Sequence, residues 1–119
     1  MRQSDVPPWL HDILEAITGV QAAVGGMSLE EYCASWTTRR ATERAIEIIS
    51  EASRHLPEPL RRAESDVPWR EIASIGNVLR HAYHRVDDEV IYVIVTRQLG
   101  PLEAAVRRLL DRLDAGDVG

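Results

Sequence analysis

Several residue types are missing from this sequence or rare in it, and each absence excludes a class of chemistry. The 119 residues contain no Phe and one cysteine, Cys33, so no disulfide can form within the chain and a reducing compartment is expected. Lys is absent, and all fourteen basic residues are Arg. The chain therefore has no side-chain amine for a Schiff base, while every cation is a planar group suited to phosphate.

Long apolar runs are absent as well. No stretch of eighteen apolar residues occurs, and the first ten residues, MRQSDVPPWL, lack the apolar segment of a signal peptide. We therefore expect a cytoplasmic protein without a membrane span. A chain of this length is expected to fold as a single domain over residues 1–119.

Charge is distributed unevenly along the chain. The net charge of -5 disfavours binding of a polyanion by the protein as a whole, so any nucleic-acid contact needs a local cluster of cations. Before Thr37 the only Arg is Arg2. Between Arg54 and Arg85, by contrast, six Arg accompany four acids. An anionic ligand is therefore expected to bind the middle of the chain.

Apolar residues recur at helical spacing over most of the sequence. A first amphipathic helix is predicted to stop at Gly25, and a capping box that begins at Ser28 starts a short second helix. Thr37 or Thr38 is expected to cap a third helix, which continues until Pro57 ends it.

The second half of the chain continues in the same way after a polar connection. Asp66 and Pro68 are expected to start a fourth helix, and a break or kink at Pro101 precedes the last one. The segment VIYVIV has the propensity of a strand, but no second strand candidate exists to pair with it, so we expect a helix. These elements predict an all-α fold, an antiparallel bundle of four or five helices.

The predicted fourth helix carries a polar face opposite its apolar stripe. That face consists of Arg70, Asn77, Arg80, His81 and His84. In most helices such a face is simply solvated. The alternative is a site, because His can transfer a proton near neutral pH and Arg can hold a phosphate, which suits phosphodiester cleavage or phosphate binding.

The same region resembles a known family. The stretch VPWREIASIGNVLRHAYHRVDDEVIYVIV, preceded by DILEAI, SLEEY and RAIEIISEA, resembles the HepT-like proteins of the HEPN superfamily. These are toxins encoded beside a minimal nucleotidyltransferase (MNT) antitoxin. The resemblance implies the HEPN helical fold, a homodimer, cleavage of RNA without a metal or other cofactor, and silencing by AMPylation of a tyrosine.

The family motif is an Arg, four residues, a His, one residue and a Tyr. His81 and Tyr83 match its last two members, which implies that His81 is the acid or base for attack by the ribose 2′-hydroxyl and Tyr83 the acceptor of AMP. Gly76 stands at the Arg position, and this is a departure from the family. Because a cation stabilises the charge that develops on the phosphoryl oxygens, Arg80 or Arg85 is the expected replacement.

The departure at Gly76 leaves two hypotheses open. The protein is either a ribonuclease, with Asn77, His84 and Arg70 lining its site, or a module without catalysis that binds the nucleotidyltransferase. Tyr83 is ambiguous too, because a regular helix turns it toward the apolar stripe. It is therefore either a core residue or a modification site at the rim of the core.

Three smaller features also have alternative interpretations. His81 and His84 with nearby acids could hold a transition metal, but helix geometry fixes no third ligand, so we expect no metal site. Trp69 could stack on a base, although a hydrophobic staple that holds the preceding loop is favoured. Cys33 is expected to be a small core residue.

Overall fold

Helices make up nearly all of the chain that the structure describes. The computed structural model describes residues 6–82 and 88–116. Its elements are α1 (Val6–Val24), α2 (Leu29–Ala34), α3 (Trp36–Arg54), α4 (Glu58–Ala63), α5 (Trp69–Ala82), α6 (Asp88–Val93), the π-helical turn η2 (Ile94–Gln98) and α7 (Leu99–Ala115). No strand occurs in these two ranges. The predicted all-α fold is confirmed, and VIYVIV is helical as expected.

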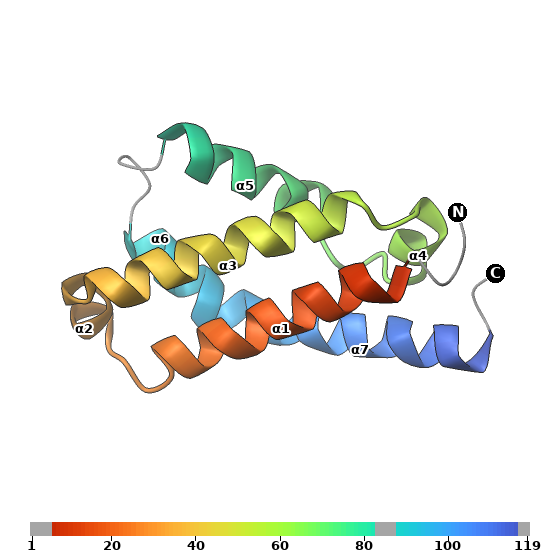
Figure 1. The fold of residues 1–119 in the computed structure, drawn as a ribbon, viewed down its shortest axis with the longest axis horizontal. Helices are drawn as coiled ribbons and strands as arrows, with labels where there is room; N and C mark the ends of the chain where they lie inside the picture. Colours follow the sequence, from red (N-terminus) through yellow and green to blue (C-terminus); the bar gives the residue numbers. More distant parts are fainter. Residues whose placement is uncertain (1–5, 83–87, 117–119) are drawn as a thin grey trace.

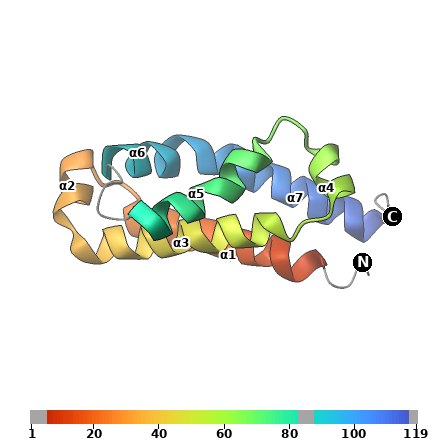
Figure 2. The ribbon, with the colours of Figure 1, turned by 90° about the horizontal axis from the view of Figure 1, so that it is seen from above.

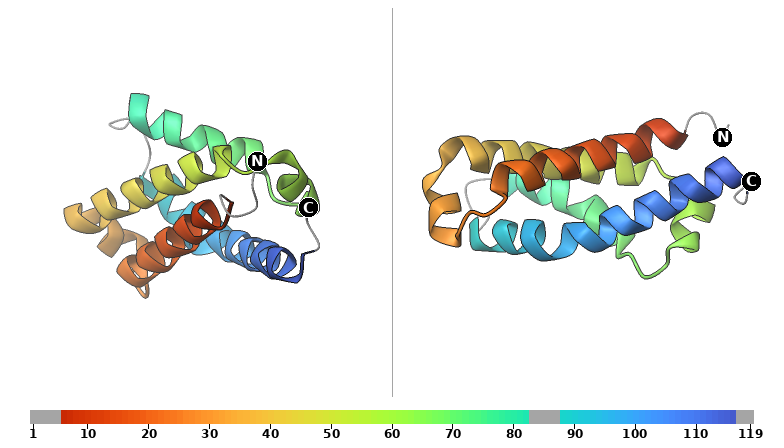
Figure 3. Two further views of the ribbon diagram at one scale, coloured as in Figure 1. Left: turned by 45° about the vertical axis from the view of Figure 1, so that its right-hand side comes forward. Right: turned by 90° about the horizontal axis from the view of Figure 1, so that it is seen from below.

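The long helices form an elongated bundle (Figure 1). α1 packs along α3, and α5 packs on α3 from another side, as the view from above shows (Figure 2). The chain from α6 through η2 into α7 runs along one side of the molecule, next to α1 (Figure 3). None of the helices in the described ranges is long and apolar enough to cross a bilayer.

The core is aliphatic and is supplied mainly by α1, α3 and α7. The stripes predicted for the first and last helices lie in it, since the following side chains are buried: Leu10, Ile13, Ile17, Val20, Val24, Leu102, Val106 and Leu109. α3 also buries four polar side chains, which are Thr38, Thr42, Ser50 and Ser53. α3 is therefore covered on several sides, as expected for the central helix of the bundle.

The start of the second helix was predicted correctly, and the start of the third was not. Ser28 Oγ accepts the Glu31 N–H at 3.1 Å and the Glu31 carboxylate accepts the Ser28 N–H at 2.9 Å, which is the expected capping box. The cap of α3 is Ser35, whose Oγ accepts the Thr38 N–H at 3.2 Å. Thr37 and Thr38 are already helical, because a single residue separates α2 from α3.

Two further expectations need correction. The polar connection contains the short helix α4, which has a single buried residue, Leu60, and so gives almost no apolar period. Cys33 is exposed rather than a core residue. In the six-residue α2 the buried side chain is its neighbour Tyr32, so Cys33 falls on the outer face.

No break occurs at Pro101. The helix continues from α6 to α7, and the irregularity is the wide turn η2, immediately before α7. In a regular α-helix the ring of Pro101 would collide with the carbonyl of Arg97, and Pro has no N–H to donate to it. The π-helical turn that contains Arg97 relieves this conflict, so the helix accommodates the proline without ending.

Candidate functional site

The predicted site residues lie on α5 and directly after it. α5 ends at Ala82. The described part of the chain leaves out the side chains of Asn77, Arg80 and His81, and the whole of Tyr83, His84 and Arg85. Arg70 is described, and it is exposed in the first turn of α5. The roles assigned to these residues therefore stay predictions. The structure does show how α5, the helix that leads to them, packs on its neighbours.

Trp69 fixes the start of α5. Its side chain is buried, and its indole Nε1 donates to the carbonyl oxygens of Arg61 at 3.1 Å and Glu64 at 3.0 Å. Both acceptors belong to α4 or its C-terminal end. The ring therefore holds α5 to the preceding segment, which is the role that the sequence analysis favoured for Trp69. It is not available to stack on a base.

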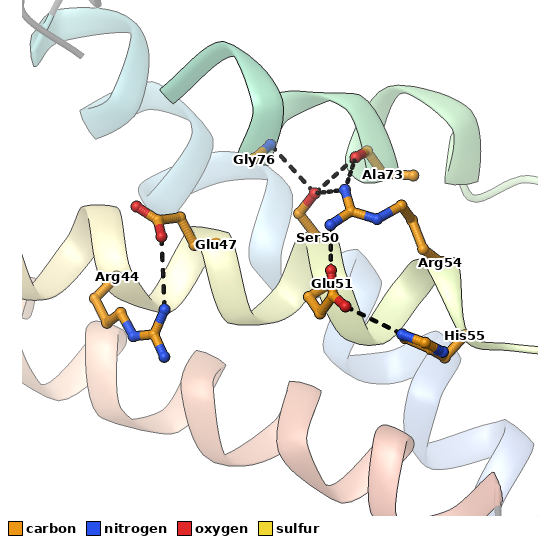
Figure 4. Close-up of polar contacts among 8 residues, drawn as sticks. All are labelled: Arg44, Glu47, Ser50, Glu51, Arg54, His55, Ala73 and Gly76. Atoms are coloured by element: carbon orange, nitrogen blue, oxygen red, sulfur yellow. Dashed lines mark hydrogen bonds and ion pairs between the residues drawn. The ribbon is translucent and has the colours of Figure 1, made fainter. Parts of the chain in front are cut away.

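The middle of α5 is held against α3 by a cluster of hydrogen bonds around Ser50 (Figure 4). The buried Ser50 hydroxyl donates to the carbonyl of Ala73 at 2.7 Å and accepts the Gly76 N–H at 3.2 Å. Arg54 Nη1 donates to the same Ala73 carbonyl at 2.8 Å and to Ser50 Oγ at 3.3 Å. Side chains of α3 thus hydrogen-bond to the backbone of α5 at residues 73 and 76, about one turn before residue 81.

Gly76 is the point of closest approach in this contact. A Cβ atom at residue 76 would lie 2.6 Å from Ser50 Oγ and 2.8 Å from Ser50 Cβ, which is too short for either contact. Ser50 Cβ is fixed to the backbone of α3, so it cannot swing away. Position 76 therefore has no room for an arginine in this packing. The close contact between α3 and α5 requires the glycine that departs from the family motif.

Arg54 is the cation that lies nearest to Gly76 among these contacts, but both of its terminal nitrogens, Nη1 and Nη2, already have partners. Nη1 serves Ser50 and Ala73, and Nη2 forms an ion pair with Glu51. Hydrogen bonds from Arg54 and from His55 lower the pKa of the Glu51 carboxyl. Arg54 therefore acts as a clamp between the helices and does not replace the missing motif arginine.

A cavity of about 430 Å³, which sequence reasoning missed, lies between α5, α3, η2 and α7. Its walls include Ile46 and Ile49 of α3, Ile72 and Ile75 of α5, and Ile94 of η2. No local sequence pattern predicts such a cavity, because the presence of a cavity depends on how far apart the helices lie.

One end of this cavity is bordered by a paired contact between two charged residues. Arg108 of α7 donates from Nε and Nη2 to the two carboxylate oxygens of Glu64, at 3.0 and 2.8 Å. These hydrogen bonds lower the pKa of Glu64 and raise that of Arg108. Within residues 6–82 and 88–116, no group of three or more His, Cys, Asp or Glu is placed to hold a metal ion.

Comparison with known proteins identifies the family. The model of the family described as "Ribonuclease HepT-like" matches residues 13–109. This chain belongs to the HepT-like ribonuclease family. Its relatives include a protein of Caldanaerobacter subterraneus subsp. tengcongensis named as a candidate RNase, 33% identical over 88% of this chain and 94% of the relative.

Two archaeal relatives have similar identity to this HepT-like chain. A protein of Thermococcus cleftensis, named as a candidate ribonuclease HepT, is 34% identical over 85% of this chain and 92% of its own. A candidate RNase of Methanocaldococcus jannaschii is 32% identical over 89% of this chain and 97% of its own. No solved structure matches this chain. The resemblance that the sequence suggested is thereby confirmed at the level of the family.

Two of the three tyrosines of this HepT-like chain are part of the fold. Tyr32 is fully buried, and burial raises its pKa to about 12. Tyr92 is half-buried beside it, with the ring centroids 5.7 Å apart, and its hydroxyl donates to the carbonyl of Met27. The Tyr32 side chain is thus enclosed by the fold, and the Tyr92 hydroxyl is tied to the backbone of Met27.

Proposed function

We propose that this protein is the toxin of an HEPN/MNT toxin–antitoxin pair, an RNA endonuclease that needs no metal and is silenced by AMPylation of Tyr83. The observation that carries the proposal is the family match over residues 13–109, which includes the motif residues His81 and Tyr83. The partner is a nucleotidyltransferase of the MNT type, and the substrate is RNA.

The proposed cleavage uses the ribose itself as the nucleophile. The 2′-oxygen attacks the adjacent phosphorus, the bond from phosphorus to the 5′-oxygen breaks, and protons leave the first oxygen and reach the second. His81 transfers one of these protons, since an imidazole can do so near neutral pH. A guanidinium from Arg80 or Arg85 holds the phosphoryl oxygens as they gain charge, with Asn77 and His84 around them. Arg70, about three turns before His81, contacts the RNA further along α5.

The assignment of the AMP acceptor is supported by elimination. Tyr32 is buried, and the hydroxyl of the half-buried Tyr92 is engaged by the carbonyl of Met27, so both are less suited to a partner enzyme than an exposed tyrosine. Tyr83 is the remaining tyrosine of the chain and stands at the motif position. AMP attached there adds a negative phosphate two residues from His81, where it repels the phosphate of an RNA substrate.

A second function has its own support from Gly76. Because α3 leaves no room for a side chain at that position, the chain has been shaped around the loss of the motif arginine. If no other arginine has taken over, the protein is a module that binds the nucleotidyltransferase without cutting RNA.

The proposed toxin acts as a homodimer. The apolar cavity beside α5 and the half-buried Ile72 and Ile75 offer a surface that a second copy can cover. Family members are expected to place the catalytic cleft between two subunits. Sedimentation velocity of the purified chain gives the mass of the particle directly, and a monomer at all concentrations would remove this part of the proposal.

The experiment that decides between the two functions is cleavage of a labelled structured RNA in the presence of a chelator. Wild-type protein and His81→Ala are prepared identically. Cleavage by the wild type alone supports the ribonuclease, whereas no cleavage, or equal cleavage by both, supports the binding module. In cells, only the ribonuclease predicts that His81→Ala removes toxicity while the complex with the nucleotidyltransferase keeps its stability.

A further inference from the structure

A row of three side chains, in which Trp36 and Arg44 are exposed and Arg40 is half-buried, runs along α3 toward its N-terminus. Trp36, Arg40 and Arg44 stand four residues apart, so they follow one another along one flank of the helix at steps of about 6 Å. Trp36 is 65% exposed, the most exposed large apolar side chain in the described part of the protein. A single exposed apolar side chain is common on protein surfaces, so Trp36 is of interest only because of the two arginines that follow it.

The three side chains are organised with respect to each other. The Arg40 guanidinium lies over the Trp36 ring, with Cζ 5.8 Å from the ring centroid. Arg40 also pairs with Glu43 at 2.9 Å, and Arg44 with Glu47 at 3.5 Å. Arg44 is 71% exposed, so its ion pair contributes little to stability and a phosphate can compete for it at small cost, whereas the pair of Arg40 with Glu43 is partly buried.

Along the axis of α3 the row is level with the part of α5 that carries the family motif, and Arg44 points away from α5, toward α1, where it borders a pocket with Trp9 and Asp12 (Figure 4). α3 and α5 are antiparallel, because Arg54 contacts Ala73 while Glu47 lies next to Gly76. Residue 81 is five residues, about 7.5 Å, further along α5. Following the same register, its backbone is level with roughly residue 44 of α3.

We propose that Trp36, Arg40 and Arg44 bind a single strand of RNA at the level of the site on α5. The Trp36 ring stacks on a base, and the two guanidinium groups hold successive backbone phosphates. This rests on the proposed ribonuclease function, and it adds a second helix to the substrate surface.

The pattern favours RNA over a protein ligand. An aromatic ring followed by cations at regular steps matches a strand that alternates bases and phosphates. A protein interface is instead centred on a cluster of large apolar side chains. The other large apolar side chain that is exposed in the described ranges is Val90, and it belongs to a different helix, α6.

The test measures binding separately from cleavage. Fluorescence anisotropy is recorded with a labelled single-stranded RNA whose 2′-hydroxyls are methylated, so that it cannot be cut, in chelator and at several salt concentrations. Trp36→Ala is expected to weaken binding about tenfold or more, and Trp36→Tyr to restore most of it, because stacking tolerates a change of ring.

The cations are tested through the salt dependence. Arg40→Gln and Arg44→Gln should each reduce the slope of log affinity against log salt by about 0.7, the value for one phosphate contact on a single strand. Arg107→Gln is the matched control, since Arg107 is 60% exposed and paired with Glu103 on α7, and it should leave the slope unchanged. Glu47→Gln, which frees Arg44, should tighten binding.

The outcomes separate this inference from the function on which it rests. If the wild type binds no RNA, the ribonuclease proposal and the row both fail. If the wild type binds and the row variants bind equally well, the row alone is wrong. Row variants that keep RNA affinity but weaken the complex with the nucleotidyltransferase would also overturn it, and would identify a protein contact instead.

Discussion

The two sides of α5 differ in how they are attached to the rest of the protein. Toward α3, backbone meets side chain within hydrogen-bond distance at Ser50 and Arg54, and no additional atom fits at Gly76. Next to these contacts, the half-buried side chains of Ile72 and Ile75 border a cavity that α3, η2 and α7 also line. The helix that carries the motif is therefore tightly packed at one set of positions and borders open space at another.

The difference implies that α5 responds unequally to substitution. On the α3 side the geometry is determined by specific polar contacts in a close-packed region. Adding or removing atoms there is therefore expected to lower stability. On the cavity side the existing space can absorb changes in volume. Substitutions at the two sets of positions test whether α5 responds in this unequal way.

The largest effect is expected at Gly76. Gly76→Arg, which would restore the family motif, should cost about 3 kcal/mol or more of unfolding free energy, because the side chain cannot be placed without displacing α5. Gly76→Ala should cost about 1–3 kcal/mol in spite of the better helix propensity of Ala. Urea unfolding followed by circular dichroism measures both values.

Gly19 provides the control for Gly76. It lies within α1, and a Cβ there would meet nothing within 4 Å. Gly19→Ala should therefore stabilise the protein by up to about 1 kcal/mol through helix propensity alone. If Gly76→Ala stabilised the protein as much as Gly19→Ala does, the close α3–α5 contact would be wrong.

The next effect is expected at Ser50, with Ser53 as its counterpart one turn along α3. Ser50→Ala removes a buried hydroxyl that bonds with Ala73 and Gly76, and should cost about 1–2 kcal/mol. Ser53 Oγ is also buried but has no hydrogen-bond partner. Ser53→Ala should be neutral or slightly stabilising, because it removes an unsatisfied polar atom. Equal losses for the two variants would contradict the role given to Ser50.

These predictions depend on contacts that the sequence did not reveal. The helices themselves follow from the apolar period, and the capping box from the spacing of Ser28 and Glu31, since both are local patterns. Ser50 and Gly76 are separated by 26 residues, and nothing local pairs them. The cavity was missed for the same reason, because it depends on the distance between helices.

For the candidate site, too, the sequence could supply one part of the prediction and not the other. His81 and Tyr83 were found through the family motif, which lies within one helical region of the sequence. The sequence also located the departure at Gly76, but it could not tell a neutral replacement from a structural requirement. The Ser50 side chain of α3 makes that distinction, since it leaves no space for a side chain at position 76.

A smaller effect is expected on the cavity side. Ile75 is half-buried, and Ile75→Ala should cost about 1 kcal/mol or less, below the 2–5 kcal/mol usual for a fully buried isoleucine. The same urea titration applies. A loss as large as that of a core residue would mean that the cavity is closed in solution and that α5 is held equally on both sides.

The smallest effect concerns Glu64, which joins the segment before α5 to α7. Arg108 lowers the pKa of this carboxyl below its ordinary value of 4.5, so ionised Glu64 stabilises the fold above that pH. The stabilisation is lost as the pH falls through the depressed folded pKa, because both states are then protonated. Glu64→Gln removes the contribution at neutral pH. The difference in unfolding free energy between wild type and variant should therefore shrink as the pH is lowered from 6 to 3. A difference that does not depend on pH would show that the Glu64–Arg108 ion pair does not stabilise the fold.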